Sequence, residues 1–145
     1  MSRVINPNSA GKERTRLTRA VALAVRELAK TDPLSNEGQL NEAHDLAAFI
    51  VLALEIVSET IEVSVVAWEK RNYWVKADKF RMEWRWAGQY SSLMREAVLK
   101  DDWVNVAKIA MQVAVKLQKI KISDKHRMGR PWKGSWGKLK MENGK

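Results

Sequence analysis

The central segment of this 145-residue chain, residues 31–69, contains no lysine or arginine but eight acidic residues. Its small and apolar residues recur in alternate steps of three and four, a spacing typical of a helix that packs along its whole length: Leu40, Ala43, Ala47, Ile50, Leu54, Val57, Ile61, Ser64 and Trp68. A second apolar face adds Leu46, Phe49, Ala53, Ile56 and Val63. Because both faces must be covered, we predict that a helix beginning after Ser35 lies at the centre of a helical bundle.

Three further segments have helical periodicity. The first, residues 9–32, starts at Ser9, a suitable N-cap, and ends before Pro33, which disfavours helix at the preceding residue. Its apolar face consists of Leu17, Ala20, Val21, Ala24 and Leu28. A helix end is expected at Arg71 and Asn72, because asparagine suits that position. The next helix then has its own seam: Tyr73, Ala77, Phe80, Trp84, Ala87, Ser91, Met94 and Val98.

The last periodic segment is capped by Asp101 or Asp102, and its apolar face includes Trp103, Val106, Ala110, Val113, Leu117 and Ile120. The connection before it is so short that the two helices must form an antiparallel hairpin. We therefore predict an all-α fold, an up-down bundle of about four helices over residues 9–121. Residues 1–8 are expected to form a flexible N-terminus. Residues 122–145, which contain Gly and Trp, are predicted to be a basic tail that is mostly extended or disordered.

Composition excludes several classes of protein. The chain has no cysteine, so disulfides, thiolate metal sites and a cysteine nucleophile are ruled out, and a reducing compartment fits. The first 30 residues lack the apolar stretch of a signal peptide. The most apolar run, residues 46–57, is interrupted by Glu55 and is shorter than the roughly 20 residues that a membrane span requires. We expect a cytoplasmic protein without a membrane span.

No catalytic or cofactor-binding motif is present: the chain has neither a G-x-S-x-G nor a P-loop pattern. Glu55, Glu59 and Glu62 share one helical face, where they could hold Mg²⁺. A di-iron centre would need Glu-x-x-His pairs, and neither His44 nor His126 follows a glutamate at that spacing. We expect the acidic face to pair with lysines and arginines of a neighbouring helix, and we assign no catalytic residue, metal ligand or cofactor.

Basic residues on both sides of the central segment give the chain a net charge of +9, which attracts polyanions. On the first helix, cations recur about once per turn and are spaced to follow phosphates: Lys12, Arg16, Arg19, Arg26 and Lys30. Only Leu23 interrupts this stripe. The alternative is that the stripe is a solvated face, or one paired with the acidic face.

Two later segments combine cations with aromatic residues, as single-stranded nucleic acid requires for stacking and charge neutralisation. Within residues 73–86, Tyr73, Phe80 and Trp84 fall on the core seam. The candidates for a partner surface are Trp74 and Trp86, which lie off it, with Lys79 and Arg85 beside them. In the tail the candidates are Arg127, Arg130, Trp132, Lys133 and Trp136. Alternatively, both tail tryptophans fold back onto the bundle, or the tail docks into a partner protein.

Three functions compete. The first is a non-catalytic, nucleic-acid-binding helical protein, an accessory subunit that contacts the phosphates of RNA or DNA. It requires cations from distant segments to gather in one unneutralised groove. The second is a protein-interaction module, a homodimer or an adaptor, because the central helix has two apolar faces and the chain is rich in tryptophan. The third is a Mg²⁺-dependent enzyme that uses the glutamate cluster.

Overall fold

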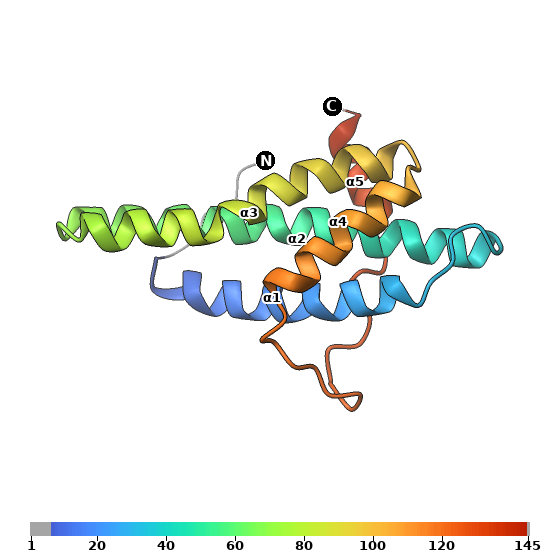
Figure 1. The fold of residues 1–145 in the computed structure, drawn as a ribbon, viewed down its shortest axis with the longest axis horizontal. Coiled ribbons are helices and arrows are strands. Elements are labelled where there is room, and N and C mark those ends of the chain that lie inside the picture. Colours follow the sequence, from blue (N-terminus) through green and yellow to red (C-terminus); the bar gives the residue numbers. More distant parts are fainter. Residues whose placement is uncertain (1–6, 145) are drawn as a thin grey trace.

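The computed structural model describes residues 7–144, which form five helices and no strand. The helices are α1 (Pro7–Ala29), α2 (Glu37–Lys70), α3 (Trp74–Leu99), α4 (Trp103–Lys116) and α5 (Ser135–Asn143) (Figure 1). The predicted all-α class is therefore confirmed. The predicted number of helices is wrong by one, because α5 lies in the segment expected to be an unstructured tail.

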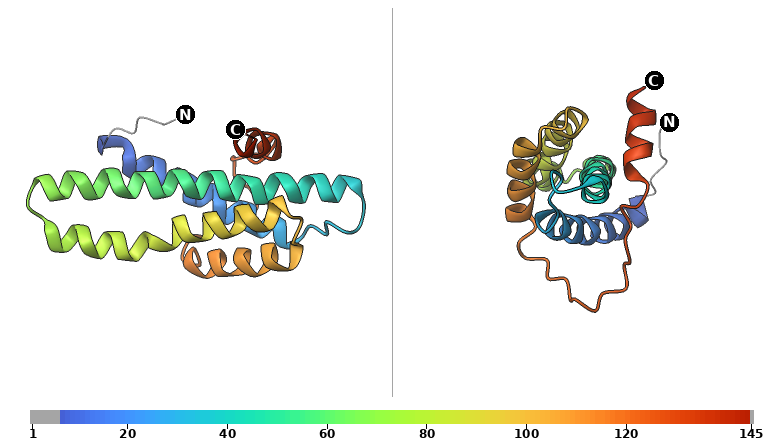
Figure 2. Two further views of the ribbon diagram at one scale, coloured as in Figure 1. Left: turned by 90° about the horizontal axis from the view of Figure 1, so that it is seen from above. Right: turned by 90° about the vertical axis from the view of Figure 1, so that its right-hand side faces the viewer.

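The helix α2 is the centre of the molecule, as its two apolar faces predict. It has 34 residues and a length of roughly 50 Å. The side chain of its N-cap, Asn36, accepts a hydrogen bond from the backbone N of Gln39. Viewed end-on, α2 lies between α3 and α4 on one side and α5 on the other, with α1 along a third side (Figure 2). Residues on both of its faces, among them Leu46, Ile50 and Leu54, are completely buried.

The predicted helix end near Asn72 and the predicted hairpin between α3 and α4 are both confirmed. At the end of α2, Asn72 adopts a left-handed backbone with φ 64°, and Asp101 between α3 and α4 does the same with φ 52°. Asparagine and aspartate tolerate this conformation better than other residues with a side chain. The Asp102 side chain then caps α4 by accepting a hydrogen bond from the backbone N of Asn105. As a result, α3 and α4 form the antiparallel hairpin.

The first helix differs from the prediction in two respects. It begins at Pro7, not after a Ser9 cap, because proline suits the first turn, where its missing N–H is not needed. Of the predicted flexible N-terminus, Pro7 and Asn8 thus belong to α1, and residues 1–6 lie outside the described residues. Leu23 does not interrupt a surface stripe, since it is completely buried in the core.

After α4 the chain forms a long connector, residues 117–134, which projects away from the bundle before α5 (Figure 2). The prediction that residues 122–145 are mostly extended or disordered is wrong for α5. This helix of nine residues packs against α2, and its Leu139 side chain is completely buried. Within the described part of the chain, no helix combines the length and the apolar character that crossing a membrane requires.

Candidate nucleic-acid interface

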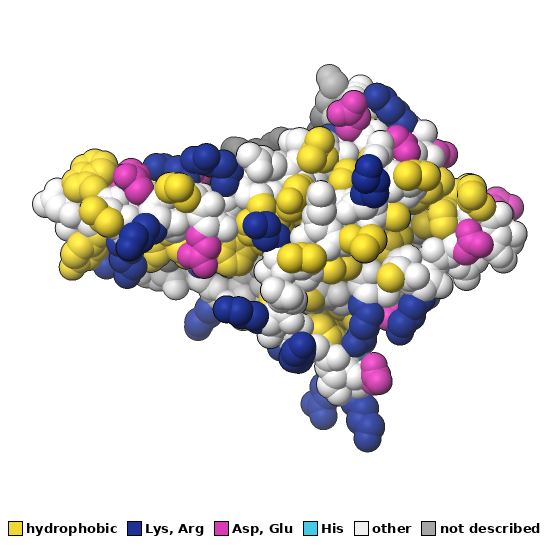
Figure 3. Space-filling view, in the orientation of Figure 1, with side chains coloured by type: hydrophobic (Ala, Val, Ile, Leu, Met, Phe, Trp, Pro, Cys, Tyr) yellow, Lys and Arg dark blue, Asp and Glu magenta, His cyan; other side chains and the backbone are white. Residues whose placement is uncertain are grey.

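The predicted cationic residues do not gather in one groove. They lie in separate regions: along α1, on α3 near the reversal after α2, and on the connector. On the face shown in Figure 3, lysine and arginine side chains are spread along the molecule, and several of them project with the connector. The expectation of a single cationic groove is therefore wrong for this face, and each region must be judged by its own residues.

The reversal between α2 and α3 forms one end of the molecule (Figure 1) and carries four aromatic residues. We call them the aromatic tip: Trp68, Tyr73, Trp74 and Phe80. Tyr73 and Trp74 are 55% and 56% exposed, and neither ring contacts another aromatic ring of the described residues. Tyr73 was predicted to be a core residue. It is exposed because it precedes the first turn of α3, beyond the part of the helix that α2 covers.

The other two residues of the aromatic tip give it a rigid base. The rings of Trp68 and Phe80 meet edge to face, with their centroids 4.8 Å apart. Both pack on a small core cluster of Ile61, Val65 and Ala77. Aromatic pairs in this geometry stabilise a structure beyond the area that they bury. The end of the molecule is therefore held in place even though two of its aromatic rings face solvent.

Cations surround the aromatic tip. The Lys76 Nζ atom lies 4.5 Å from the centroid of the Trp68 ring, and the Arg14 guanidinium of α1 lies 4.8 Å from that of Phe80. Arg14 also donates hydrogen bonds to Thr60 and Ser64 of α2, and burial lowers the pKa of its guanidinium. A hollow of about 580 Å³ opens beside these groups, lined by Trp68, Val75, Lys76, Lys79, Phe80 and Glu83.

Three acidic residues near the aromatic tip converge on one arginine of α3, whereas Glu83, which lines the hollow, is exposed and does not pair with it. Arg81 lies 3.1 Å from Glu62, 3.7 Å from Glu69 and 3.8 Å from Asp78, and the hydrogen bond with Glu62 raises its pKa. The remaining cations of this end are exposed, and within residues 7–144 none of them forms an ion pair: Lys70, Arg71, Lys76 and Lys79. The aromatic tip therefore has an excess of positive charge.

The glutamates of α2 pair with a neighbouring helix, as the sequence predicts. In addition to the Glu62–Arg81 pair, Glu55 forms an ion pair with Arg95 of α3. Among the described residues there is no group of three or more acidic or histidine side chains placed to hold a metal ion. Of the three clustered glutamates, Glu55 and Glu62 thus form ion pairs with α3, and Glu59 does not.

The four candidates on α3 have different environments. Trp74 and Arg85 are exposed, and Lys79 lines the hollow beside the aromatic tip. The prediction for Trp86 is wrong: it is 8% exposed, and its ring lies against those of Trp84 and Tyr90. Helix α3 turns Trp86 inward because it packs against both α2 and α4, so its buried face is wider than a single seam.

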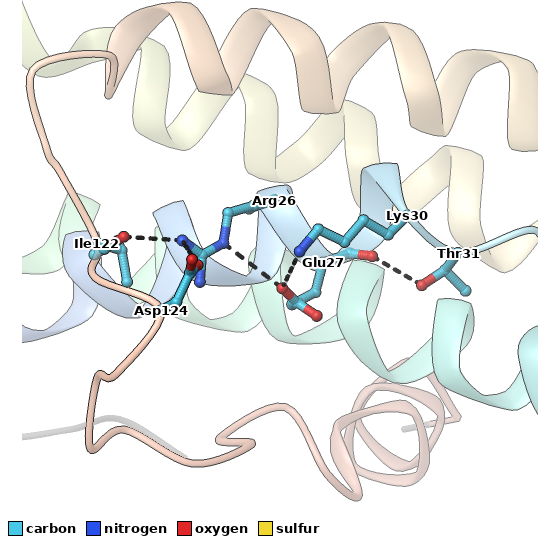
Figure 4. A network of polar contacts seen from close by, with 6 residues as sticks. All are labelled: Arg26, Glu27, Lys30, Thr31, Ile122 and Asp124. Carbon is cyan, nitrogen blue, oxygen red and sulfur yellow. Dashed lines mark hydrogen bonds and ion pairs between the residues drawn. The ribbon is translucent and has the colours of Figure 1, made fainter.

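The cations of α1 divide into two groups. Lys12, Arg16 and Arg19 are exposed, and Arg16 lies 3.3 Å from Glu13. Arg26 instead holds the connector in place. Its Nη1 donates a 2.9 Å hydrogen bond to the backbone oxygen of Ile122 and lies 3.6 Å from Asp124 (Figure 4). Its guanidinium is therefore already bound within the chain, and Lys30 lies beside Glu27 in the same network.

The connector is the third cationic region. Arg127 and Lys133 are exposed, as are Lys119, Lys121 and Lys125. The third candidate, Arg130, is paired with Glu42 of α2. Beneath the connector lies a hollow of about 490 Å³ whose lining mixes Arg26, Lys30 and Arg130 with Glu27, Glu42 and Asp124. Because its charges alternate, this hollow is not suited to a polyanion, and only the outer side of the connector presents unpaired cations.

Both tail tryptophans fold back onto the bundle, which is the alternative considered for them: Trp132 is buried and Trp136 is partly buried. The Nε1 of Trp132 donates a 2.6 Å hydrogen bond to Glu42, and the residue is almost fully buried. The Trp136 ring stacks on the imidazole of His44 with their centroids 4.2 Å apart. Asp45 accepts hydrogen bonds from the backbone N of Gly134 and of Trp136, and it thereby caps α5 from another helix.

His44 joins three parts of the chain. Its Nε2 lies 2.6 Å from Asp101 Oδ1 at the α3–α4 reversal, and its ring lies between Trp136 and Trp103. The imidazole is buried. We call His44, Trp103, Trp132 and Trp136 the closed end. Its aromatic rings are held by α2, by α4 and by the tail, so they serve the packing of the fold.

Sequence reasoning did not identify Trp68, Tyr73, Lys70, Arg71 and Lys76 as members of one site. The available signal was their position on either side of the predicted helix end at Asn72, which brings both helix ends together. Comparisons of this chain with protein-family models, with curated proteins and with solved structures find no match. A functional hypothesis therefore depends on the site itself.

Proposed function

We propose that this protein is a non-catalytic nucleic-acid-binding protein, an accessory subunit that holds single-stranded RNA or DNA at the aromatic tip. The cations of distant segments do not gather in one groove, so the proposal rests on the aromatic tip alone. There, Tyr73 and Trp74 are exposed among cations that lack an acidic partner. Bases stack on the two exposed rings, and phosphates contact the cations around them. We place this function in the cytoplasm, since a chain without cysteine fits a reducing compartment.

The proposed contacts divide the affinity into two measurable parts. Phosphate contacts release counterions, so each contact with a single strand contributes a slope of about −0.7 in a plot of log affinity against log salt. Stacking of a base on an aromatic side chain contributes about 1–3 kcal/mol and depends little on salt. Because stacking requires unpaired bases, a single strand should bind more tightly than a duplex of the same length.

The first experiment is filter binding of a generic oligonucleotide to the full chain between about 50 and about 300 mM salt. We expect binding at low salt, a steep loss of affinity as salt rises, and a preference for the single strand over the duplex. Absence of binding at the lowest salt concentration would overturn the proposal. Equal affinity for both forms would exclude stacking at the aromatic tip.

The second experiment tests the exposed ring. Trp74→Ala should weaken oligonucleotide binding by about tenfold, because it removes one stacking surface. Met141→Ala is the matched control, since Met141 is also exposed but lies on α5, away from the aromatic tip. The control should bind as the wild type does. If both variants bind equally well, Trp74 is not part of the interface.

A third experiment compares the cations of the aromatic tip with those of the connector at equal loss of charge. One variant replaces Lys70, Lys76 and Lys79 by Gln, and the other replaces Lys125, Arg127 and Lys133 by Gln. For the first variant, the slope of log affinity against log salt should become less negative by about 2, because three phosphate contacts are removed. The second variant should lower affinity only slightly, because it reduces the net positive charge of the protein without removing a phosphate contact. A larger effect of the connector variant would assign the site to the connector and contradict our proposal.

A further inference from the structure

Helix α4 has an apolar outer face that no other part of the described chain covers. Val104, Met111 and Val115 are 73%, 71% and 62% exposed and recur at steps of seven and four, so they lie on one side of the helix. The opposite side, with Val106, Ala110 and Val113, packs into the core. Ala107 and Ala114 extend the outer face and are also exposed. Figure 3 shows apolar side chains on this side of the molecule, where α4 is the outermost helix.

The outer face is apolar in its middle and charged with opposite sign at its two ends. Lys108 is the only charged residue between Trp103 and Val115. Asp101 and Asp102 precede the helix. The exposed Lys116 is its last residue, and the exposed Lys119 and Lys121 follow it. Apart from the contact of Asp101 with His44, these end charges form no ion pair within the described chain.

We infer that the outer face of α4 binds the same face of a second copy of this chain, with the two α4 helices antiparallel. An antiparallel arrangement places the acidic start of each helix beside the basic end of the other. It also places the positive end of each helix dipole beside the negative end of the other, which is favourable. A parallel arrangement would place the aspartates of both copies together, and likewise the lysines. The charges of α4 are therefore complementary to those of a second α4 helix that runs in the opposite direction.

The spacing of the apolar residues fits the twofold axis that such a dimer requires. With the axis between Ile109 and Ala110, Val104 of one copy faces Val115 of the other, and Met111 faces Lys108 in both halves. The Lys108 stem can cover the Met111 side chain while its ammonium group reaches water. The same apolar contacts then occur twice. This inference is independent of the proposed nucleic-acid site, which lies at the α2–α3 end.

The first experiment measures the oligomeric state of the full chain by light scattering as a function of concentration. We expect a dimer for the wild type and for Met141→Lys, and a shift of the dissociation constant by at least about tenfold for Met111→Lys. The two methionines are 71% and 72% exposed, so the two substitutions are matched in exposure and in charge. A monomeric wild type at micromolar concentrations, or equal effects of both substitutions, would overturn the inference.

The second experiment tests the antiparallel register and uses the absence of cysteine from the chain. Val104→Cys and Val115→Cys are prepared separately and exposed to a mild oxidant, alone and mixed. The antiparallel dimer predicts a disulfide-linked dimer in the mixture and little in either single preparation. Cross-linking of Val104→Cys with itself would indicate a parallel contact and contradict the proposed register. Met141→Cys mixed with Val115→Cys gives the background of random collision.

Discussion

The closed end and the aromatic tip contain similar residues in opposite situations. At the closed end, Trp132 donates its ring N–H to Glu42, and Trp136 stacks on His44. At the aromatic tip, Tyr73 and Trp74 face solvent. Acidic residues account for much of this difference. Glu42 and Asp45 receive the tail at the start of α2, whereas Glu62 and Glu69 at its other end are engaged by Arg81. The tryptophan content of a chain therefore does not by itself indicate a binding surface.

The largest expected effect concerns a buried tryptophan of the closed end. Trp132→Ala should lower the free energy of unfolding by about 3–5 kcal/mol, because it leaves a cavity and removes a hydrogen bond to Glu42. Urea denaturation of the purified variant measures this change. Oligonucleotide affinity under native conditions should stay close to that of the wild type. A loss of affinity in a variant that is still folded would mean that the closed end takes part in binding.

A smaller effect is expected when the acceptor of that hydrogen bond is removed. Glu42→Ala should cost about 1–3 kcal/mol, since the ring N–H of the buried Trp132 loses its partner. The Arg130 ion pair is lost as well, but Arg130 is exposed and contributes little. Glu59→Ala is the matched control, because Glu59 is an exposed glutamate of the same helix. Equal melting temperatures of the two variants would show that Glu42 does not hold the tail.

The cap that α2 supplies to α5 should have a local effect. Asp45→Ala should cost about 1 kcal/mol, because the N-cap residue of α5 is Gly134, which has no side chain to cap the helix. Hydrogen exchange should become faster in α5 and remain unchanged in the aromatic tip. Uniformly faster exchange over the whole chain would instead indicate that α5 unfolds together with the bundle.

The smallest expected effect on stability is that of Trp74→Ala at the aromatic tip. An exposed side chain away from any core contact contributes within about 0.5 kcal/mol. Thermal melting should therefore leave this variant close to the wild type, although its oligonucleotide binding is weakened. The contrast with Trp132→Ala would be lost if Trp74→Ala destabilised the protein by several kcal/mol, because Trp74 would then be a structural residue.

Much of the bundle follows from the sequence because the signals are local. The positions of α2 and α3, the start of α4 and both reversals agree with the apolar spacing and with Asn72 and Asp102. Helix α4 ends at Lys116, before Leu117 and Ile120, which were predicted to belong to it. The tail could not be predicted in this way. Its helix has nine residues, fewer than a periodic pattern needs to be recognised, and its main apolar anchor is Leu139. The partners of Trp132 and Trp136 lie 90 and 91 positions earlier in the chain.

The candidate site was predicted in part. Trp74, Lys79 and Arg85 were identified from their position off the core seam, and all three are exposed. Tyr73 and Trp86 were assigned to the wrong environments, because a single helical seam does not show where the covering helix ends or how wide the buried face is. These properties depend on how α3 lies between α2 and α4.

The helical class of this chain, the burial of α2 on two sides, the helix end near Asn72 and the hairpin near Asp101 all follow from local sequence patterns. Apolar periodicity and backbone preference act between residues a few positions apart, so they can be read along the chain. Which tryptophans pack into the fold and which remain exposed depends on how distant segments meet. That outcome depends on contacts such as the one between Glu42 and Trp132, which the folding of the tail onto α2 creates.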